Sequence, residues 1–396
     1  MKKPVPTVQP ADRAARLTAL RREKMSESAH AYVRGSTVRF YEWLAAAGRG
    51  AIPEGPPVWI CGDCHVGNLG PVASAGGALA VQIRDFDQTV VGNPAHDLVR
   101  LGLSLAMAAR GSDLPGATTA HVVEHMMAGY EAAFAGDADV AVPETVRRTM
   151  RRAAGRSWRH LADERIEGTR AGIPLGPRFW PLEADERAAI DALFGREDLR
   201  ALVTSLRARD DDAEVSVIDA AYWRKGCSSL GLLRCAVLVA VGHGRTERHC
   251  LIDLKEAVAA AAPRAEGRAM PRDNAERVVS GARALSPHLG ERMLPLRMLD
   301  RAVFARELLP QDLKLEIESL TRAEAVEVAT FLAATVGQAH ARQMTPDERT
   351  AWLAELGRNR AGALDAPSWL WRAIVELVGT HESAYLDHCR KHALAA

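Results

Sequence analysis

Three polar residues, Asp63, Asn68 and Asp85, are candidates for chemistry because of their types and spacing. Asp63 and Asn68 lie five positions apart in GDCHVGN, and Asp85 lies in IRDFDQT, where Asp87 follows it. Asp and Asn oxygens suit Mg²⁺, a hard cation that prefers oxygen ligands. A further carboxylate can orient a hydroxyl group for attack on a phosphate. These residues therefore predict phosphate chemistry that depends on a divalent cation.

The elements around these residues should place them at the ends of strands. Val58 to Ile60 has the pattern of a short strand that leads into the first segment, and residues 78–83 form a second that leads into the other. Residues 92–110 begin at a turn and continue as an apolar helix. Upstream, residues 11–47 are expected to be helical, with a break near Arg34-Gly35.

The rest of the chain predicts an α+β protein. Residues 115–210 are expected to be mostly helical. From Val215 to Leu254 the sequence alternates in β-branched runs separated by glycines, which predicts a small antiparallel sheet. Helices are expected to return at Asn274, and the last long ones should cover residues 322–342 and 366–393.

Three linked motifs resemble the aminoglycoside and choline kinase-like branch of the protein kinase fold. That branch carries a pattern close to H-G-D-x-x-x-x-N, then I-D-W-x, then G-x-P-x-x-D-L-A. The counterparts here are Cys61-Gly62-Asp63 to Asn68, then Asp85-Phe86-Asp87, then Gly92-Asn93-Pro94 with Asp97-Leu98. Cys61 replaces the histidine of the pattern, which changes no metal ligand.

This resemblance implies an enzyme that uses ATP and Mg²⁺. Asp63 would be the catalytic base, Asn68 and Asp85 would hold Mg²⁺, and Asp97 would brace the catalytic loop from the following helix. Asp87 is either a further metal ligand or a brace of its own loop. The expected function is a phosphotransferase that acts on an unidentified hydroxyl acceptor, a small molecule.

The phosphate-covering half of a kinase site is expected downstream of these motifs rather than upstream. A kinase needs a glycine-rich hairpin and a strand lysine paired with a helix glutamate. The candidates are Lys255, Glu276 and the glycine-rich loop, which comprises Gly226, Ser228, Ser229 and Gly231. Taken alone, these glycines fit a plain hairpin turn better, because short turns that contain glycine are common. The succession of hairpin, strand lysine and helix glutamate is what favours the functional interpretation.

The order of the motifs predicts a circularly permuted, two-lobed kinase-like fold. Residues 1–213 would form a helical catalytic lobe, 214–303 a small β-rich nucleotide-binding lobe, and 304–396 the hinge and C-terminal helices. The hinge is expected near Phe304-Ala305-Arg306-Glu307, and the helix ending VGQAHAR resembles the one that normally precedes the catalytic loop. A large separation between Lys255 and Asp85 would contradict this arrangement.

The whole chain also resembles a family of uncharacterised bacterial proteins, the domain of unknown function 2252 family. The shared features are Lys24-Met25-Ser26 with Arg34-Gly35, the GD-x-H-x-x-N loop, the DFD motif and a later KEA. This resemblance covers nearly the whole chain and names no substrate.

Bulk composition excludes partners that depend on a strong net charge. With 51 basic and 50 acidic residues among 396, the formal charge is +1, which indicates neither a nucleic acid nor a membrane partner. The chain has no export signal or membrane-spanning segment, and its six scattered cysteines suit free thiols, so we expect a cytoplasmic protein.

Several residues have a structural interpretation beside the functional one. Cys61 and Cys64 form a C-x-x-C motif, but the sequence offers no second pair of ligands for a zinc ion. We therefore interpret them as two small residues on either side of the expected base rather than as a zinc site. His65 could reach a phosphate or bond within its loop, and Arg34 could contact a ligand or pack on the loop. An arginine run at positions 147, 148, 151, 152, 156 and 159 could bind an anionic acceptor or form a solvated helix face.

Three other functions stay open at the level of sequence. Asp63 and His65 satisfy the D-x-H opening of calcineurin-like phosphoesterases, although the later GDxxD and GNH elements of that type do not occur. A nucleotide-binding pseudokinase and a kinase-fold AMP transferase would use the same residue types. The acceptor itself and the oligomeric state are not defined by any motif.

Overall fold

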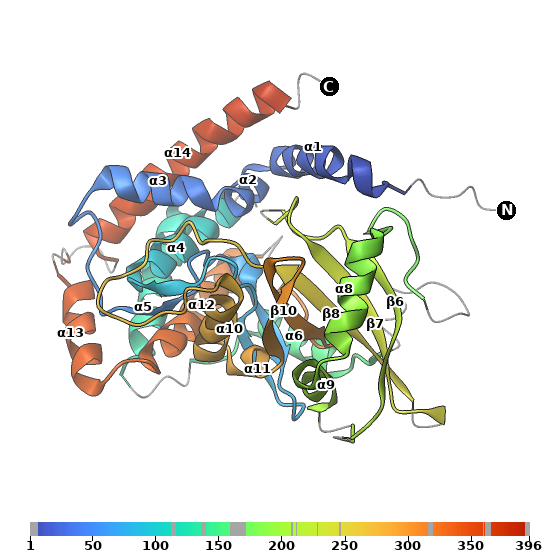
Figure 1. The fold of residues 1–396 in the computed structure, drawn as a ribbon. Coiled ribbons are helices and arrows are strands. Elements are labelled where there is room, and N and C mark those ends of the chain that lie inside the picture. Colours follow the sequence, from blue (N-terminus) through green and yellow to red (C-terminus); the bar gives the residue numbers. More distant parts are fainter. Residues whose placement is uncertain are drawn as a thin grey trace.

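The structure is a computed structural model that mixes helices with antiparallel sheets. It describes residues 7–111, 116–135, 140–158, 172–206, 209–210, 212–227, 229–244, 247–315, 320–358, 360 and 366–392. A mainly helical part lies beside a six-stranded sheet, and the first and last helices lie on the same side of the molecule (Figure 1). The expected α+β class is confirmed.

The N-terminal helical region consists of three helices that follow a 3-10 turn at Pro10–Asp12. They are α1 (Arg13–Ser26), α2 (Ala29–Gly35) and α3 (Thr37–Ala47). The expected break after Arg34-Gly35 is therefore present. A second break precedes α2, where the Ser28 side chain caps the helix by accepting a hydrogen bond from the Ala31 N–H at 3.0 Å.

Two short antiparallel pairs hold the segments that contain Asp63 and Asp85. Strand β1 (Val58–Ile60) pairs with β4 (Val90–Gly92), and β2 (Leu69–Ala73) pairs with β3 (Leu79–Ile83). The register sets Leu69 opposite Ile83, and the Arg84 N–H donates to the Asn68 carbonyl at 2.8 Å. Strand β2 was not predicted, because Gly70 and Pro71 disfavour a strand locally.

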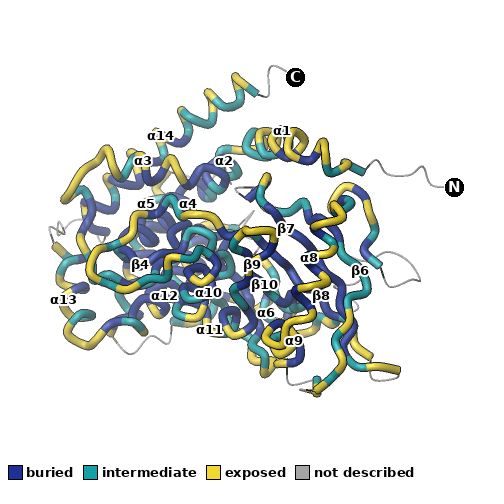
Figure 2. Tube along the Cα trace, viewed as in Figure 1, coloured by how far each residue is buried: buried dark blue, intermediate teal, exposed yellow. Residues whose placement is uncertain are grey.

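The remaining helices build the core beneath these hairpins. They are α4 (Ala95–Gly111), α5 (Gly116–Ala132), α6 (Glu144–Ala154), α12 (Arg322–Ala341), α13 (Pro346–Leu356) and α14 (Ser368–His392). Apolar side chains of α4, α5, α12 and α14 share one buried cluster with residues of the hairpins. Figure 2 shows this buried interior between exposed outer faces. None of the described helices combines the length and the apolar character needed to cross a membrane.

The large sheet has the strand order β5-β6-β7-β8-β10-β9, with every neighbouring pair antiparallel. Its strands are β5 (Phe179–Trp180), β6 (Val215–Trp223), β7 (Arg234–Val241), β8 (Arg248–Glu256), β9 (Met293–Met298) and β10 (Arg301–Leu308). All of β7 is buried, and its side chains alternate between two apolar clusters. Helices α8 (Ala184–Phe194) and α9 (Glu197–Thr204) cover one face with part of α1.

The sheet is larger than the alternating pattern predicted. It begins at Phe179 and ends at Leu308, so it extends beyond both ends of the β-rich lobe expected at residues 214–303. The boundaries of the lobes stay a prediction. The expected hinge at Phe304–Glu307 was wrong: these residues lie inside β10, where they pair with β8 and β9. The chain leaves the sheet only after Leu308. Helices α10 (Asn274–Leu285) and α11 (Pro287–Gly290) connect β8 to β9.

Candidate active site

The loop after β1 is shaped by Gly62, which positions Asp63. Gly62 has a φ of +74°, and a Cβ atom at this position would lie 2.1 Å from the Gln88 carbonyl oxygen. Only glycine fits a backbone that approaches another loop so closely at positive φ. The Tyr41 hydroxyl donates to the Gly62 carbonyl at 2.6 Å. The loop therefore has one tightly defined path into the site.

Asp63 is a buried carboxylate paired with a buried arginine. The Arg100 Nε donates to Asp63 Oδ1 at 2.8 Å, and Arg100 Nη2 donates to the Val33 carbonyl at 2.6 Å. Burial raises the pKa of Asp63, and the charge of Arg100 opposes that rise. Arg100 was not among the sequence candidates. It lies three positions after Asp97, so both face the same loop from one side of α4.

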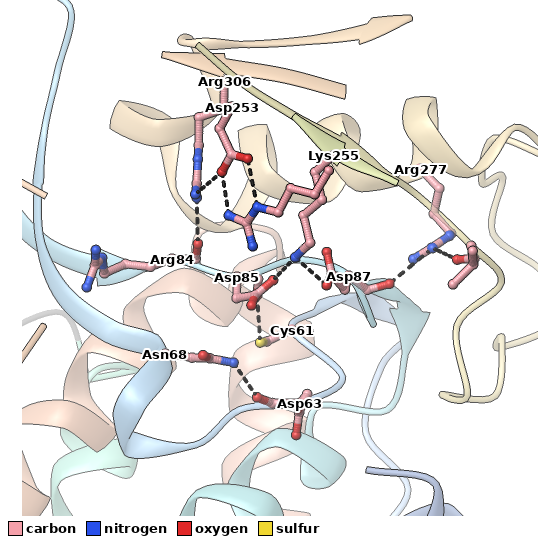
Figure 3. Close-up of polar contacts among 12 residues, drawn as sticks. Cys61, Asp63, Asn68, Arg84, Asp85, Asp87, Asp253, Lys255, Arg277 and Arg306 are labelled. Carbon is pink, nitrogen blue, oxygen red and sulfur yellow. Dashed lines mark hydrogen bonds and ion pairs between the residues drawn. The ribbon is translucent and has the colours of Figure 1, made fainter. Parts of the chain in front are cut away.

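Asn68 is fixed against the same loop by its side chain. Its Nδ2 donates to the Asp63 carbonyl at 3.0 Å, which leaves Oδ1 as the oxygen that a metal ion could use. Because Asn68 lies beside Arg84 across the β2–β3 pair, it is also adjacent to the segment that carries Asp85. Figure 3 shows Asp63, Asn68 and Asp85 grouped around Cys61, whose thiol contacts the Asp85 carbonyl.

Asp97 braces the loop from the start of α4, in the position the sequence predicted. Its two carboxylate oxygens accept from the backbone N–H groups of Cys61 at 2.7 Å and Gly62 at 2.8 Å. The His340 Nε2 on α12 lies 3.2 Å from Asp97 Oδ2, and its Nδ1 lies 2.9 Å from the Tyr130 hydroxyl. All of these groups are buried, so a polar chain connects α12 and α5 to the loop.

Lys255 meets Asp85 and Asp87 although 170 positions separate Lys255 from Asp85. Its Nζ lies 3.4 Å from Asp85 Oδ1 and forms an ion pair with Asp87 Oδ2. Burial disfavours the charged form of Asp85, but the charges of Lys255 and Arg306 outweigh it and hold the pKa of Asp85 well below its usual range. Burial and the neighbouring charge of Asp85 raise the pKa of Asp87. One ammonium group thus balances two carboxylates.

The expected Lys255–Glu276 pair was wrong. In α10 the buried side chains include those of Ala275 and Val278, whereas Glu276 falls on the exposed face of the first turn. The adjacent Arg277 points inward instead, and its Nη2 donates to the Asp87 carbonyl at 3.1 Å and to the Val258 carbonyl at 2.8 Å. The helix therefore supports the Asp87 loop through an arginine.

The glycine-rich loop between β6 and β7 is only partly in the site. Gly226 has a φ of +100°, lines the cavity described below, and accepts a hydrogen bond from Lys24 Nζ at 2.6 Å through its carbonyl. Ser229 also lines that cavity, whereas Gly231 is exposed and does not. Ser228 lies outside the described residues. The loop also rests on α2, because a Cβ at Gly35 would lie 3.0 Å from the Cys227 sulfur.

A cavity of about 560 Å³ joins the two halves of the site. Asp63, Asn68, Asp85 and Lys255 all line it. Its lining is strongly basic, with ten Lys or Arg residues against three acidic ones. The basic residues are Lys24, Arg34, Arg84, Arg178, Arg224, Lys225, Arg234, Lys255, Arg306 and Lys314, and the acidic ones are Glu27, Asp63 and Asp85. Such a lining favours a highly anionic ligand.

A buried charge cluster on the sheet was not predicted. Arg234 Nε on β7 donates to Asp253 Oδ1 on β8 at 2.8 Å, and Arg306 Nη2 on β10 donates to Asp253 Oδ2 at 3.0 Å. Arg306 Nη1 also donates to the Arg84 carbonyl at 3.2 Å, directly before Asp85. Charged residues inside otherwise apolar strands were the available signal, since they are rarely buried unless paired.

Some of the other sequence candidates line the cavity, and others do not. Arg34 and His65 line the cavity, and the Gly67 N–H donates to His65 Nδ1 at 3.1 Å. Burial and the charge of Arg34 hold the pKa of His65 well below its usual range. Cys61 and Cys64 are free, buried thiols. Within the described part of the arginine run, no member lines the cavity; Arg159 lies outside the described residues.

The donor set fits Mg²⁺ better than a metal bound by protein alone. The described residues contain no group of three or more His, Cys, Asp or Glu side chains arranged to hold a metal ion. Mg²⁺ is usually held by one or two carboxylates together with substrate phosphates. Asp85, Asp87 and the Asn68 amide supply such a set, and Asp87 Oδ1 is buried without a hydrogen-bond partner among the described residues.

Comparison with known proteins gives one match. No curated protein and no solved structure matches the chain. A family model described as an uncharacterised protein conserved in bacteria, DUF2252, matches residues 13–391. That match spans all the elements of the site described above. The chain therefore belongs to the DUF2252 family of bacterial proteins.

Proposed function

We propose that this protein is an ATP- and Mg²⁺-dependent phosphotransferase with a circularly permuted kinase-like fold, acting on a hydroxyl group of a small molecule. The observation that carries the proposal is the approach of Lys255 Nζ to within 3.4 Å of Asp85 Oδ1. Two motifs with the chemistry of a kinase site, distant in the sequence, share one cavity with Asp63 and Asn68.

A contact between the end of α12 and strand β1 supports the permuted order. In ordinary kinases the helix before the catalytic loop continues directly into it. Here Gln343, just after α12, accepts from the Trp59 N–H at 2.8 Å and donates to the Trp59 carbonyl at 3.1 Å, although 284 positions separate them. The end of α12 is thus joined to the strand that enters the catalytic loop.

The chemistry assigned to each residue follows from its contacts. Arg100 holds Asp63 Oδ1, so the other oxygen is available to accept the proton of an acceptor hydroxyl. That hydroxyl oxygen bonds to the terminal phosphorus of ATP, the bond to the bridging oxygen breaks, and ADP leaves. Lys255 provides a donor for the phosphates, and Asn68, Asp85 and Asp87 would hold Mg²⁺, which neutralises charge on the transferred group.

The raised pKa of Asp63 is compatible with this role. A base must be deprotonated to accept the proton, so activity should rise as the pH increases through the pKa of Asp63. Burial places that pKa above the ordinary value for aspartate, while Arg100 limits the rise. The hydrogen bond from Arg100 favours the charged form of Asp63 that this role requires.

Transfer of labelled phosphate tests the proposal and separates it from its alternatives. The protein would be incubated with Mg²⁺, a bacterial small-molecule extract, and ATP labelled at the α- or γ-phosphate. We expect the γ-label, and not the α-label, in a new product. Transfer of the α-label would indicate an AMP transferase, and release of phosphate from a test ester without ATP would indicate a phosphoesterase.

Substitutions at Asp63 and Asp85 test which step of the reaction each residue serves. Asp63→Asn should bind Mg²⁺ and ATP but lose transfer, whereas Asp85→Asn should lose the Mg²⁺-dependent part of ATP binding. Asp198→Asn, which removes an exposed carboxylate paired with Arg196, is the matched control and should behave as wild type. Full transfer by the Asp63→Asn protein would contradict the assignment of the base.

A further inference from the structure

The cavity carries more positive charge than the proposed donor needs. Its ten basic and three acidic lining residues leave an excess of seven positive charges. A fully ionised nucleoside triphosphate with one divalent cation keeps only about two net negative charges. The nucleotide alone therefore does not explain the excess positive charge of the lining.

Part of the excess is neutralised within the sheet. Arg234 and Arg306 share Asp253, and Lys255 pairs with Asp85 and Asp87. These charges belong to the framework of the donor side. Five of the remaining basic residues lie on the other wall of the cavity, which is formed by α1, α2, the loop after Trp223 and the segment after β10. They are Lys24, Arg34, Arg224, Lys225 and Lys314.

Four residues of this second wall form a cluster that we call the outer basic cluster: Lys24, Arg34, Arg224 and Lys314. Among the described residues, no carboxylate lies within ion-pair distance of any of them. The Nε atoms of Arg34 and Arg224 are buried and have no hydrogen-bond acceptor there either. Lys24 has the Gly226 carbonyl as a neutral partner.

These like charges are close enough to repel one another. Burial, and then the charge of Arg224, lower the pKa of Lys24. Burial, and then the charges of Arg34 and Arg84, lower the pKa of Lys314. Holding unpaired cations together in a partly enclosed space costs free energy, which a bound anion would offset.

The outer basic cluster lies beside the proposed base. A Cβ at Gly67, in the loop of Asp63, would lie 3.2 Å from the Arg34 Cζ. The acceptor must place its hydroxyl group at Asp63, so the rest of the acceptor occupies the neighbourhood of Arg34. An arginine presents a planar fork of donors that suits a phosphate or carboxylate.

We propose that the acceptor is an anion, a hydroxyl compound that also carries a phosphate or carboxylate group bound by the outer basic cluster. This inference rests on the proposed function. It also sets the protein apart from enzymes that act on aminoglycosides or choline, because a cationic acceptor would be repelled by these residues.

Binding of a small anion to the nucleotide-loaded protein tests the inference. The protein is first saturated with Mg²⁺ and a non-hydrolysable ATP analogue, and binding of the analogue is measured by calorimetry. Glycerol 3-phosphate is then titrated at constant ionic strength, with glycerol as the uncharged probe. We expect the phosphate compound to bind and glycerol not to bind.

Variants locate the site of the anion. Arg34→Gln and Lys314→Gln should each weaken glycerol 3-phosphate at least tenfold and leave binding of the analogue within about twofold. Arg34→Lys should give an intermediate affinity, because charge is kept and the fork is lost. Arg148→Gln, on the exposed face of α6, is the matched control and should bind as wild type.

The outcomes distinguish the two proposals. If the analogue binds and glycerol 3-phosphate does not, or if the Arg34→Gln and Lys314→Gln proteins bind it as well as wild type, the anionic acceptor is wrong and the proposed function survives. If the analogue itself does not bind, the proposed function fails, and the acceptor inference fails with it.

Discussion

Asp63 illustrates how one buried ion pair can stabilise the charged form of a candidate catalytic group. Arg100 is fully buried, bonds to Asp63 Oδ1 and also holds the Val33 carbonyl at the end of α2. Without this cation, burial alone would push the carboxyl group towards its neutral form. At the scale of single residues, the charge of Asp63 depends on an arginine from a helix rather than on a neighbour in its own loop.

Removing Arg100 should therefore destabilise the protein strongly. Arg100→Met keeps most of the side-chain volume but leaves Asp63 buried and unpaired, which costs about 3–5 kcal/mol of unfolding free energy. The loss of unfolding free energy should become smaller as the pH falls, because protonation of Asp63 removes the unpaired charge. Urea unfolding at pH 8 and pH 5 would measure both effects.

Two further variants make this measurement specific. Arg39→Met breaks an exposed pair with Glu42 and should change stability by less than about 1 kcal/mol. Combining Arg100→Met with Asp63→Asn should recover part of the loss, since no charge is left unpaired. A wild-type urea midpoint for Arg100→Met would show that the pair has no structural role.

The sequence identified those residues of the candidate site that lie at fixed spacings within motifs. Asp63, Asn68, Asp85 and Asp97 lie at fixed distances within motifs, and the structure brings all four around one loop. Arg100 and His340 follow no such rule, because their roles arise from helices that pack against the loop from elsewhere. The prediction that Glu276 pairs with Lys255 failed for a related reason. The face of α10 that points inward depends on packing, which the motif does not define.

At the scale of elements, the Arg234–Asp253–Arg306 cluster links three strands to the loop of Asp85. Asp253 is completely buried and accepts from both arginines. Arg306 in turn holds the Arg84 carbonyl. The sheet therefore positions the loop of Asp85 by hydrogen bonds as well as through Lys255.

Loss of the carboxylate should weaken the sheet in a pH-dependent way. Asp253→Asn leaves two buried arginines without a counter-charge and should cost about 3–5 kcal/mol at pH 7. Arg234 and Arg306 overcome the effect of burial and lower the pKa of Asp253, so its stabilisation is complete above the unfolded pKa of about 3.9 and is lost as the pH falls below it. The difference between wild type and variant in urea unfolding should narrow below about pH 4.

An exposed pair provides the control for this prediction. Asp198→Asn removes the partner of Arg196 at a site where both side chains remain largely exposed, so the expected change is below about 1 kcal/mol. If Asp253→Asn were no more destabilising than Asp198→Asn, the cluster would not hold the sheet together.

The elements differ in how far local sequence predicted them. Strands β6, β7 and β8 were predicted, because their runs are rich in β-branched residues and are separated by glycines. The β9–β10 hairpin was missed, because Met, Leu, Arg, Ala and Glu are good helix formers and its turn uses Leu299 and Asp300 at positive φ rather than glycine. Pairing of β10 with β8 outweighs these local preferences.

At the scale of the whole molecule, the arrangement of the ends agrees with a permuted chain. Helix α14 packs against α1, with the Tyr385 hydroxyl donating to the Ser26 carbonyl at 3.2 Å and His388 Nε2 lying 3.0 Å from the Arg22 carbonyl. Figure 1 shows the two helices on the same side of the molecule. Neighbouring ends are a property of chains that tolerate permutation.

Reordering the chain should therefore be tolerated. A variant that links residue 392 to residue 7 by a flexible linker and opens the loop between Thr204 and Val215 would place the sheet strands first. We expect it to fold with a wild-type circular dichroism spectrum and cooperative unfolding. Opening the chain instead between Ile83 and Asp85 should abolish folding, because that cut separates β3 from the loop of Asp85. Aggregation of the first variant would contradict the permuted arrangement.

The central claim is that Lys255 and Asp85, 170 positions apart, form one nucleotide site. Calorimetric titration of a non-hydrolysable ATP analogue with Mg²⁺ tests it on wild type, Lys255→Met, Asp85→Asn and the double variant. We predict that each single change weakens binding at least tenfold and that the double variant loses less than the sum of the two, as for residues in contact. Binding of the analogue to either single variant with wild-type affinity, or no binding to wild type, would contradict the account.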